Sequence, residues 1–520
     1  MAARFLTTRL QRSGYRFLIR RQEQAFTRRD VRGLSNPFSA QTSAVAVGIF
    51  LVALMGIIGL VVSFIKPRPD RGMDSIIATQ SGGMYVMFGG TEDNPVAKLH
   101  PVTNLASARL IVGKPDNASM VKDSTLEGIP RGPLMGIPSA PNSLAAHDKD
   151  PATWTVCDTR DAKSDLSLTT VGSINTTLIA GQDELDPDAT VMQNNQALLV
   201  KSITSPDTLW LVFDGKKTEI GRQDFATHAA LGLTPAKIDK ALSLSGALVD
   251  AIDVIPTLTI PYIDSRGRAS TLVNNHAIGD IVTIGDASGN REQYVVADNG
   301  VQRVNSIIAA LLVNTGSRQI VKEDPESVTS LPQVQIIDTS RYPDVVPNIL
   351  TPQTVCFSWA KSRHDTTATT KIYVGENIPV TDSARGDLIP LLKPEQGVVQ
   401  ANDSVMMPGK GWYVHVTGSS PTSMSNEQLM FIDDTGTRYF ISPEDASHPK
   451  EGAYDSIVHA LGLDWQLPMP IPWSIGKLYV QGSTLSFEDA RVFHAYIPPN
   501  KGGVPAPPKA GSLTPPPGQG

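Results

Sequence analysis

The hydrophobic pattern of the chain contains one long uninterrupted run, residues 44–65, which holds 22 residues without a charge. A helix rises ~1.5 Å per residue, so this run would reach about 33 Å, enough to cross the hydrocarbon core of a bilayer. The next most apolar run, residues 307–313, has the length of a core helix segment. Lys66-Pro67-Arg68-Pro69 offers no small-residue cleavage site, which favours an uncleaved anchor over a signal peptide. The pattern therefore predicts a single transmembrane helix.

Charge is divided by this run. Residues 1–43 hold nine arginines, no lysine and only two acids, Glu23 and Asp30, so they carry +7, whereas the whole chain carries −6. The body after the run is therefore net acidic, which argues against a nucleic-acid partner. The positive-inside rule predicts a single-pass protein with a cytoplasmic N-terminus and a C-terminal body outside the membrane.

The basic segment predicts a helix from about residue 15 to 30. Tyr15, Leu18, Ile19, Gln22 and Phe26 recur with helical spacing and would share one face. Two interpretations remain open: the helix rests on anionic membrane lipid, or it docks a cytosolic partner. The candidate docking residues are Tyr15, Arg16, Phe17, Leu18, Arg20, Arg21, Phe26, Arg28 and Arg29. Within the span, Ala44, Gly48 and Gly56 form a small-residue stripe that would let another helix approach closely.

The body after the run shows a recurring strand, turn and strand pattern. Residues 209–220, 293–304 and 429–440 each place an apolar run before an Asp with Gly within three residues, followed by a second run. Such turns supply the positive φ angles of tight hairpins. Short helices are expected after the hairpins, at 224–233, 304–313 and 453–463. A diverged copy starts at residue 76, with its helix expected at 99–110.

These patterns predict an α/β (α+β) fold of four degenerate repeats around a central β domain. The expected parts are a basic cytoplasmic segment (1–43), the span (44–65), a linker (66–75), repeats at 76–140, 197–265, 280–350 and 413–478, two parts of the central domain (141–196 and 351–412), a return strand (479–497) and a disordered Pro/Gly-rich tail (498–520).

The two parts of the central domain resemble each other around Thr-Val-Cys, at residues 153–160 and 353–359. Cys157 and Cys356 are the only cysteines in the chain. In an oxidising exoplasmic space we expect them to form a disulfide; the alternative is a pair of buried free thiols.

Motifs for catalysis are missing from the sequence. There is no G-x-x-x-x-G-K-[ST] phosphate loop, no G-x-S-x-G and no H-E-x-x-H, and neither cysteine has a metal-ligand spacing. We therefore expect no catalytic residue, no cofactor and no metal, and whether the chain is an enzyme stays open. A carboxylate pair could still hide among 51 acids. The alternative is therefore a membrane-anchored cell-wall (peptidoglycan) binding or hydrolysing protein, whose site would be made of such carboxylates and of some of the six tryptophans.

The N-terminal pattern, residues 13–32, reads S-G-Y-R-F-L-I-R-R-Q-E-Q-A-F-T-R-R-D-V-R and is soon followed by a single span. With the two Thr-Val-Cys segments and the repeats, it resembles the EccB family of the mycobacterial type VII (ESX) secretion system. The resemblance covers nearly the whole chain and departs at Gln24, where histidine is expected in many members. It implies a core subunit that assembles with the motor ATPase EccC, with EccD and with EccE, and a homodimer through the periplasmic domain. The sequence looks nearest to the ESX paralogue linked to iron and zinc acquisition.

Overall fold

A computed structural model describes residues 8–29, 37–65, 76–89, 97–160, 174–181, 183–285, 291–322, 325–392, 398–423, 425–443, 453–463, 465 and 467–494. The chain forms two compact units, Met1–Asp74 and Ser75–Gly520. The first unit contains α1 (Arg9–Arg28) and α2 (Pro37–Ile65). The predicted tail, 498–520, the linker, 66–75, and most of the region between α1 and α2 lie outside the described residues.

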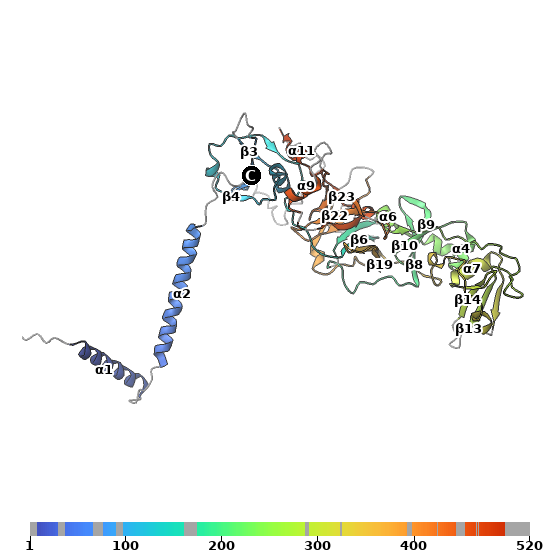
Figure 1. The fold of residues 1–520 in the computed structure, drawn as a ribbon, viewed down its shortest axis with the longest axis horizontal. Helices are drawn as coiled ribbons and strands as arrows, with labels where there is room; N and C mark the ends of the chain where they lie inside the picture. The colour runs from blue at the N-terminus through green and yellow to red at the C-terminus, as the bar shows by residue number, and fades with distance from the viewer. Residues whose placement is uncertain are drawn as a thin grey trace, which may run out of the picture. The chain divides into compact units, whose positions relative to one another are not determined.

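The second unit contains four small sheets, coloured from cyan to red along the chain in Figure 1. The first holds β1 (Ile76–Thr79), β2 (Met84–Phe88), β3 (Lys98–Pro101) and β4 (Ser119–Val121), with α3 (Leu105–Val112) before β4 and η1 (Asp123–Leu126) after it. The second holds β8 (Gln196–Ser202), β9 (Ser205–Phe213), β10 (Lys216–Ile220), β11 (Leu242–Leu244), β12 (Asp253–Val254) and β17 (Asn348–Leu350), with α4 (Phe225–Ala230), α5 (Pro235–Asp239) and α6 (Gly246–Ala251).

The third sheet holds β13 (Ile281–Gly285), β14 (Arg291–Val296), β15 (Val301–Val304) and β16 (Gln319–Lys322), with α7 (Ser306–Asn314), α8 (Glu326–Thr329) and η2 (Thr339–Arg341). The fourth holds β22 (Trp412–Thr417), β23 (Ser425–Ile432), β24 (Thr437–Phe440), β25 (Met469–Pro472) and β26 (Val480–Gln481), with α9 (Ala453–Leu461) and α10 (Trp473–Gly476).

One connection order is common to the four small sheets. In each, three consecutive strands form an antiparallel meander, helix follows, and the next strand returns parallel to the first, as β4 does beside β1 and β16 beside β13. The second and fourth sheets add a strand parallel to the third strand of the meander, β12 and β26. This order places the helices next to the sheet in every case. That the four units are copies of one ancestral repeat stays a prediction.

A six-stranded central sheet lies between these units in the sequence and combines two distant segments. It contains β6 (Ala152–Thr159), β7 (Asn175–Ala180), β18 (Thr354–Lys361), β19 (Thr369–Gly375), β20 (Leu388–Pro390) and β21 (Asp403–Val405), with η3 (Ala384–Asp387). The order is β19-β18-β6-β7-β21-β20. β6 and β18 run antiparallel along their full length, which places Trp154 opposite Trp359. Two short strands, β5 (Leu134–Met135) and β27 (Phe493–His494), pair elsewhere, and α11 (Phe487–Ala490) precedes β27.

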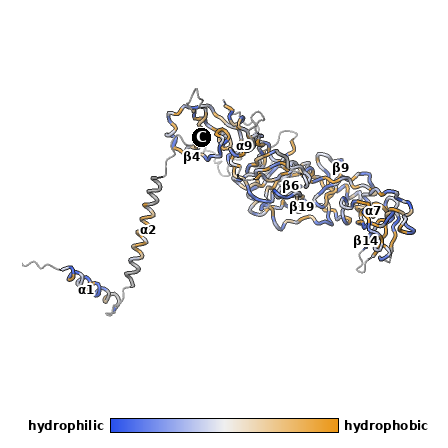
Figure 2. The backbone as a smooth tube through the Cα atoms, in the orientation of Figure 1, coloured by the Kyte–Doolittle hydropathy of each residue, from blue (hydrophilic) through white to orange (hydrophobic). Residues whose placement is uncertain are grey.

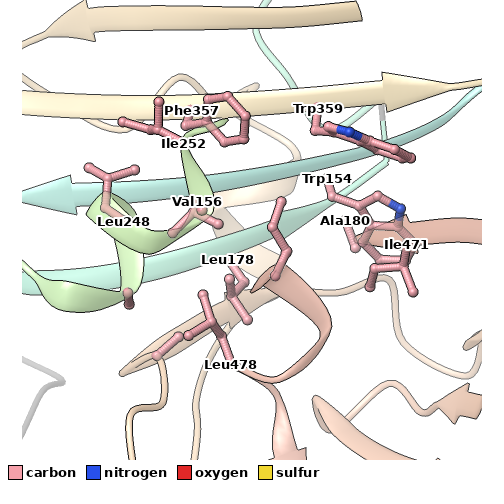
Figure 3. Close-up of a cluster of buried hydrophobic side chains, with 14 of the residues drawn as sticks. Trp154, Val156, Leu178, Ala180, Leu248, Ile252, Phe357, Trp359, Ile471 and Leu478 are labelled. Carbon is pink, nitrogen blue, oxygen red and sulfur yellow. The ribbon is translucent and has the colours of Figure 1, made fainter. Parts of the chain in front are cut away.

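Three hydrophobic cores tie the sheets to one another. One face of the central sheet shares a core with α6 and with β22, β23 and β25, centred on Trp154, Trp359 and Phe357 (Figure 3). A second core joins α3 of the first sheet to α9 of the fourth. A third joins the second and third sheets through α4 and α7. The order of packing therefore differs from the order along the chain, because the first sheet packs on the fourth.

The hairpin between β9 and β10 shows how the Asp-Gly signal acts. Asp214 and Gly215 both adopt positive φ, 47° and 68°, which the two central residues of a tight hairpin turn require. Gly436 has φ 74° in the corresponding β23–β24 hairpin. The Asp-Gly and Thr-Gly segments therefore set the registers of these hairpins.

Three expected boundaries were wrong. The helix expected at 99–110 begins only at Leu105, because residues 98–101 pair with β2 as β3 and Asn104 supplies the N-cap. The N-terminal helix begins at Arg9 rather than near residue 15, because Thr8 caps it. The expected return strand at 479–497 is instead divided into β26, α11 and β27 where the structure describes it.

Candidate functional site

The N-terminal helix α1 starts at a capping box. The Thr8 side chain accepts a hydrogen bond from the Gln11 backbone N–H, and the Gln11 side chain accepts from the Thr8 N–H. The helix ends at Arg28 and is capped by Arg29, which adopts a left-handed conformation with φ 55° and donates its N–H to the Ala25 carbonyl. Both ends of this helix are therefore set by local hydrogen bonds.

The apolar residues of α1 lie on two faces, not one. At ~100° per residue, Tyr15, Leu18, Ile19 and Phe26 fall within one stripe. Phe17 falls on the opposite side of the helix and is 65% exposed, while Phe26 is 88% exposed. The candidate docking residues therefore do not form a single surface, because Phe17 is separated from the others. The Arg28 side chain lies outside the described residues.

Arginines divide between the same two faces. Arg16 lies beside the stripe, whereas Arg20 and Arg21 flank Phe17 at ~100° per residue. The first turn of α1 contains no acidic residue. Figure 2 shows the helix as predominantly hydrophilic with isolated apolar positions.

The second helix, α2, contains the predicted small-residue stripe. Ala44, Gly48 and Gly56 are exposed, and a Cβ added at Gly48 or Gly56 would meet no atom within 4 Å. Among the described residues, no helix combines the length and the apolar character needed to cross a membrane. The side chains of residues 58–65, the last part of the predicted span, are not among those described.

The two cysteines meet within the β6–β18 pair, near the end of β6 and the start of β18. Cys157 lies directly opposite Cys356, and their Sγ atoms form a disulfide. Both side chains are buried. The bond joins residues 199 apart in sequence and so links the two segments that build the central sheet. They lie on the face opposite Trp154 and Trp359, in a separate small core.

A buried carboxylate next to the disulfide joins the central sheet to α6. Asp158 on β6 accepts hydrogen bonds from the Thr176 hydroxyl at 2.7 Å, and from the backbone N–H and hydroxyl of Ser245 at 2.6 and 2.9 Å. Ser245 also caps α6 through the Leu248 N–H. Burial raises the pKa of Asp158 to about 6, and the three donors oppose that rise. The carboxylate therefore positions one end of α6.

A different kind of joint holds the first and fourth sheets. Arg109 of α3 donates from Nη1 to the Leu461 carbonyl at 2.7 Å. The Tyr439 hydroxyl donates to the Ser139 carbonyl at 2.6 Å. Both bonds border the apolar core that α3 and α9 share. Burial lowers the pKa of Arg109 from the usual arginine value, and the nearby Asp116 opposes that change.

Within the described ranges, no group of three or more His, Cys, Asp and Glu side chains is placed to hold a metal ion. Trp154, Trp359 and Trp412 are buried in the central core, whereas Trp465 is 64% exposed. Trp473 is 39% exposed as well, so half of the six tryptophans are fully used for packing in the core.

Residues 4–499 match the family described as "Type VII secretion system ESX-1, transport TM domain B", EccB. The chain belongs to the EccB family. The "ESX-5 secretion system ATPase EccB5" of Mycobacterium tuberculosis strain H37Rv is 32% identical over 501 residues, covering 95% of this chain and 94% of that protein. The "ESX-3 secretion system ATPase EccB3" of Mycolicibacterium smegmatis is 33% identical over 512 residues, covering 96% and 92%. The resemblance read from the sequence is confirmed.

Solved EccB structures have the same fold. A chain of "Structure of an intact ESX-5 inner membrane complex" superposes with a TM-score of 0.68 at 29% identity and covers 97% of this chain and 99% of that one. "Structure of EccB3 dimer from the ESX-3 core complex" gives 0.66 at 31% identity over 81% and 100%. The mixed α/β class expected for the chain therefore agrees with these EccB assemblies.

Sequence reasoning missed the buried carboxylate. Asp158 directly follows Cys157 in a strand whose other central positions are apolar or hydroxylated. An acid in such a strand is itself a signal, because a carboxylate is almost never fully buried without partners. The partner, Ser245, lies 87 residues away and could not be named from spacing alone.

Proposed function

We propose that this EccB-family protein is a non-enzymatic structural subunit of a type VII secretion complex in the inner membrane. The observation that carries the proposal is the match to a chain of an ESX-5 inner membrane complex across 97% of this protein and 99% of that one. A match over both full lengths supports the whole architecture rather than one domain of it. The ESX paralogue linked to iron and zinc acquisition stays a prediction, because the EccB5 and EccB3 relatives are 32% and 33% identical.

The proposed topology is a single pass through residues 44–65, with the N-terminus cytoplasmic and the second unit periplasmic. It is supported by the 22 uncharged residues of this run and by the nine arginines before it. Ala44, Gly48 and Gly56 would face a neighbouring helix in the membrane. Cysteine labelling with a membrane-impermeant maleimide tests the topology: a cysteine placed at Phe493 should react in intact cells, and one placed at Thr8 should react only after lysis.

We propose that α1 docks cytosolic and membrane partners, which by the family resemblance are EccC, EccD and EccE. Its two apolar faces support docking over a helix that rests on lipid, since a lipid-bound helix needs one face only. Arg20→Glu combined with Arg21→Glu should weaken assembly by reversing charge beside Phe17. Affinity purification from detergent-solubilised membranes should then recover less motor ATPase, while the melting temperature of the periplasmic body is unchanged.

Matched alanine variants separate docking from lipid binding. Under the docking proposal, Phe17→Ala and Phe26→Ala both reduce recovery of partners. If the helix only lies on lipid with the stripe inward, Phe26→Ala alone has an effect, and in vesicle binding rather than in recovery. Recovery of the wild-type protein as a lone monomer would contradict the proposal as a whole.

We further propose that the periplasmic body pairs with a second copy of itself, a proposal supported by the solved EccB3 dimer.

We also assign no ATP hydrolysis to this chain, although the EccB5 and EccB3 relatives carry ATPase in their names. The support is the missing phosphate-loop sequence. Purified protein free of partners should release no phosphate from ATP above a buffer control. The alternative, a cell-wall binder or hydrolase, requires saturable binding to purified peptidoglycan.

A further inference from the structure

A cavity of about 670 Å³ opens between the second small sheet and the end of the central sheet at which β6 stops and β7 and β21 start. This volume lies in the range of sites for small ligands, about 300–1,000 Å³. Its polar lining comes mostly from hydroxyl and amide side chains, including Thr176, Ser243, Gln400 and Asn402. The EccB assignment uses none of these residues.

One wall of the cavity is an unpaired strand edge. β11 is the edge strand in the order β11-β8-β9-β10-β12. The Leu244 carbonyl accepts from the Ile203 N–H at 2.9 Å, so Leu244 faces β8. Successive residues of a strand turn their N–H and C=O groups to opposite sides, so those of Ser243 face away from β8, toward the cavity. Among the described strands, none pairs with this side of β11.

Apolar side chains lie around the same cavity. Ile203, Val398 and Val399 line it and are 57%, 51% and 42% exposed. An exposed strand edge beside exposed aliphatic side chains is the arrangement that binds extended peptides by strand addition. Backbone hydrogen bonds would supply affinity, and the aliphatic groups would contact alternate side chains of the peptide.

Arg160 gives the cavity its charge preference. It is the one charged residue among the described residues that line the cavity. It donates from Nη2 to the Pro352 carbonyl, and its Nε is buried without a hydrogen-bond partner. Asp158 lies nearby, but its carboxylate is occupied by Thr176 and Ser245 and does not line the cavity. A carboxylate is therefore the group that complements this site.

We propose that this cavity binds a short extended peptide that ends in a carboxylate, with its backbone added to β11 at Ser243 and its carboxylate paired with Arg160. This site is independent of the assembly role proposed above. β-branched residues in the peptide favour the extended conformation and fit the aliphatic rim.

The test uses fluorescence anisotropy with full-length protein in detergent and a fluorescein-labelled Gly-Val-Thr-Val probe. The carboxylate form should bind saturably, and the C-terminal amide should bind about tenfold more weakly because it loses the charged pair. With Arg160→Gln the two probes should differ by less than about twofold. Lack of saturable binding at millimolar carboxylate probe would overturn the proposal.

Backbone pairing has its own matched pair of variants. Ser243→Pro removes the outward N–H without touching the pairing to β8, since proline is tolerated on the outer side of an edge strand. Ser243→Pro should weaken binding of the carboxylate probe by about tenfold, whereas Ser243→Ala should change its affinity by less than about twofold. If Ser243→Pro disturbs folding, a probe N-methylated at Thr, tested on wild-type protein, replaces it. Equal binding of the methylated and unmethylated probes would refute strand addition.

Discussion

The two middle strands of the central sheet, β6 and β18, start from the same local sequence and hold the same helix in different ways. Both carry Thr-Val-Cys, and the cysteines lie opposite each other. The next residue is Asp158 on β6 and Phe357 on β18, and both side chains are buried. Val156 lies opposite Phe357 and Val355 opposite Asp158, so the two side chains project from the same face of the sheet.

That face is covered by α6, which the two strands hold at different points. Phe357 packs in one core with Leu248 and Ile252 of the α6 region (Figure 3). Asp158 binds the N-cap of the same helix through Ser245. The aromatic contact is apolar and insensitive to pH, whereas the carboxylate contact titrates. Equivalent positions of two similar strands have therefore taken complementary roles around one helix.

The disulfide is the feature that both strands share, and its loss should have the largest effect. Replacing Cys157 and Cys356 together by alanine should lower the free energy of unfolding by about 4–5 kcal/mol, because the bond closes a loop of 199 residues in the unfolded chain. Thermal unfolding under oxidising conditions measures it. If wild type and the double variant have the same melting temperature in the absence of reductant, the bond does not stabilise the fold.

Loss of the Phe357 ring should have the second largest effect on stability. Phe357→Ala should cost about 4 kcal/mol, since it deletes a buried ring and leaves a cavity between β18 and α6. The loss should be equal at pH 5 and pH 7. Phe357→Leu, which keeps most of the volume, serves as the control and should cost less than half as much. A pH-dependent loss in Phe357→Ala would mean that the two contacts to α6 are coupled.

Local sequence predicted the features of these strands that depend on neighbouring residues, and it did not predict those that depend on packing. Cys157 and Cys356 were paired from their matching Thr-Val-Cys settings, because a duplicated segment places equivalent residues at equivalent positions. The Asp214–Gly215 turn was predicted because positive φ depends on local sequence alone. The contact of Asp158 with Ser245, the Arg109 bond to Leu461 and the edge of β11 depend on how distant segments pack. Periodicity carries no information on such packing.

The contact of Asp158 with α6 should make the stability of the protein depend on pH. Burial raises the pKa of Asp158 from 3.8 to about 6 in the folded protein. A raised pKa means that the folded state holds the proton more tightly, so the favourable contribution is complete below about pH 4 and is lost as pH rises through about 6. At about 1.4 kcal/mol per pKa unit, the loss is about 3 kcal/mol.

Asp158→Asn tests this value because asparagine does not titrate. The difference in unfolding free energy between wild type and Asp158→Asn should shift by about 2.4 kcal/mol between pH 4 and pH 7, with wild type relatively weaker at pH 7. Denaturant unfolding at several pH values measures the shift. Asp207→Asn, at an exposed aspartate, is the matched control for the loss of one carboxylate. A flat difference for Asp158→Asn would show that the three donors fully offset burial.

The smallest expected effect is that of Ser245→Ala, which removes the N-cap of α6 but leaves the Asp158 carboxylate in place. Ser245→Ala removes the hydroxyl that donates to Asp158 and accepts from the Leu248 N–H, and loss of such a cap costs about 1 kcal/mol. The backbone N–H of residue 245 still donates to the carboxylate, so the pH swing of Asp158 should survive. Because one of three donors is gone, the pKa of Asp158 should rise further, and the midpoint of the swing should move to higher pH. A midpoint that stays at its wild-type pH would mean that the hydroxyl acts on α6 alone, and the two contacts would then be independent supports of the helix.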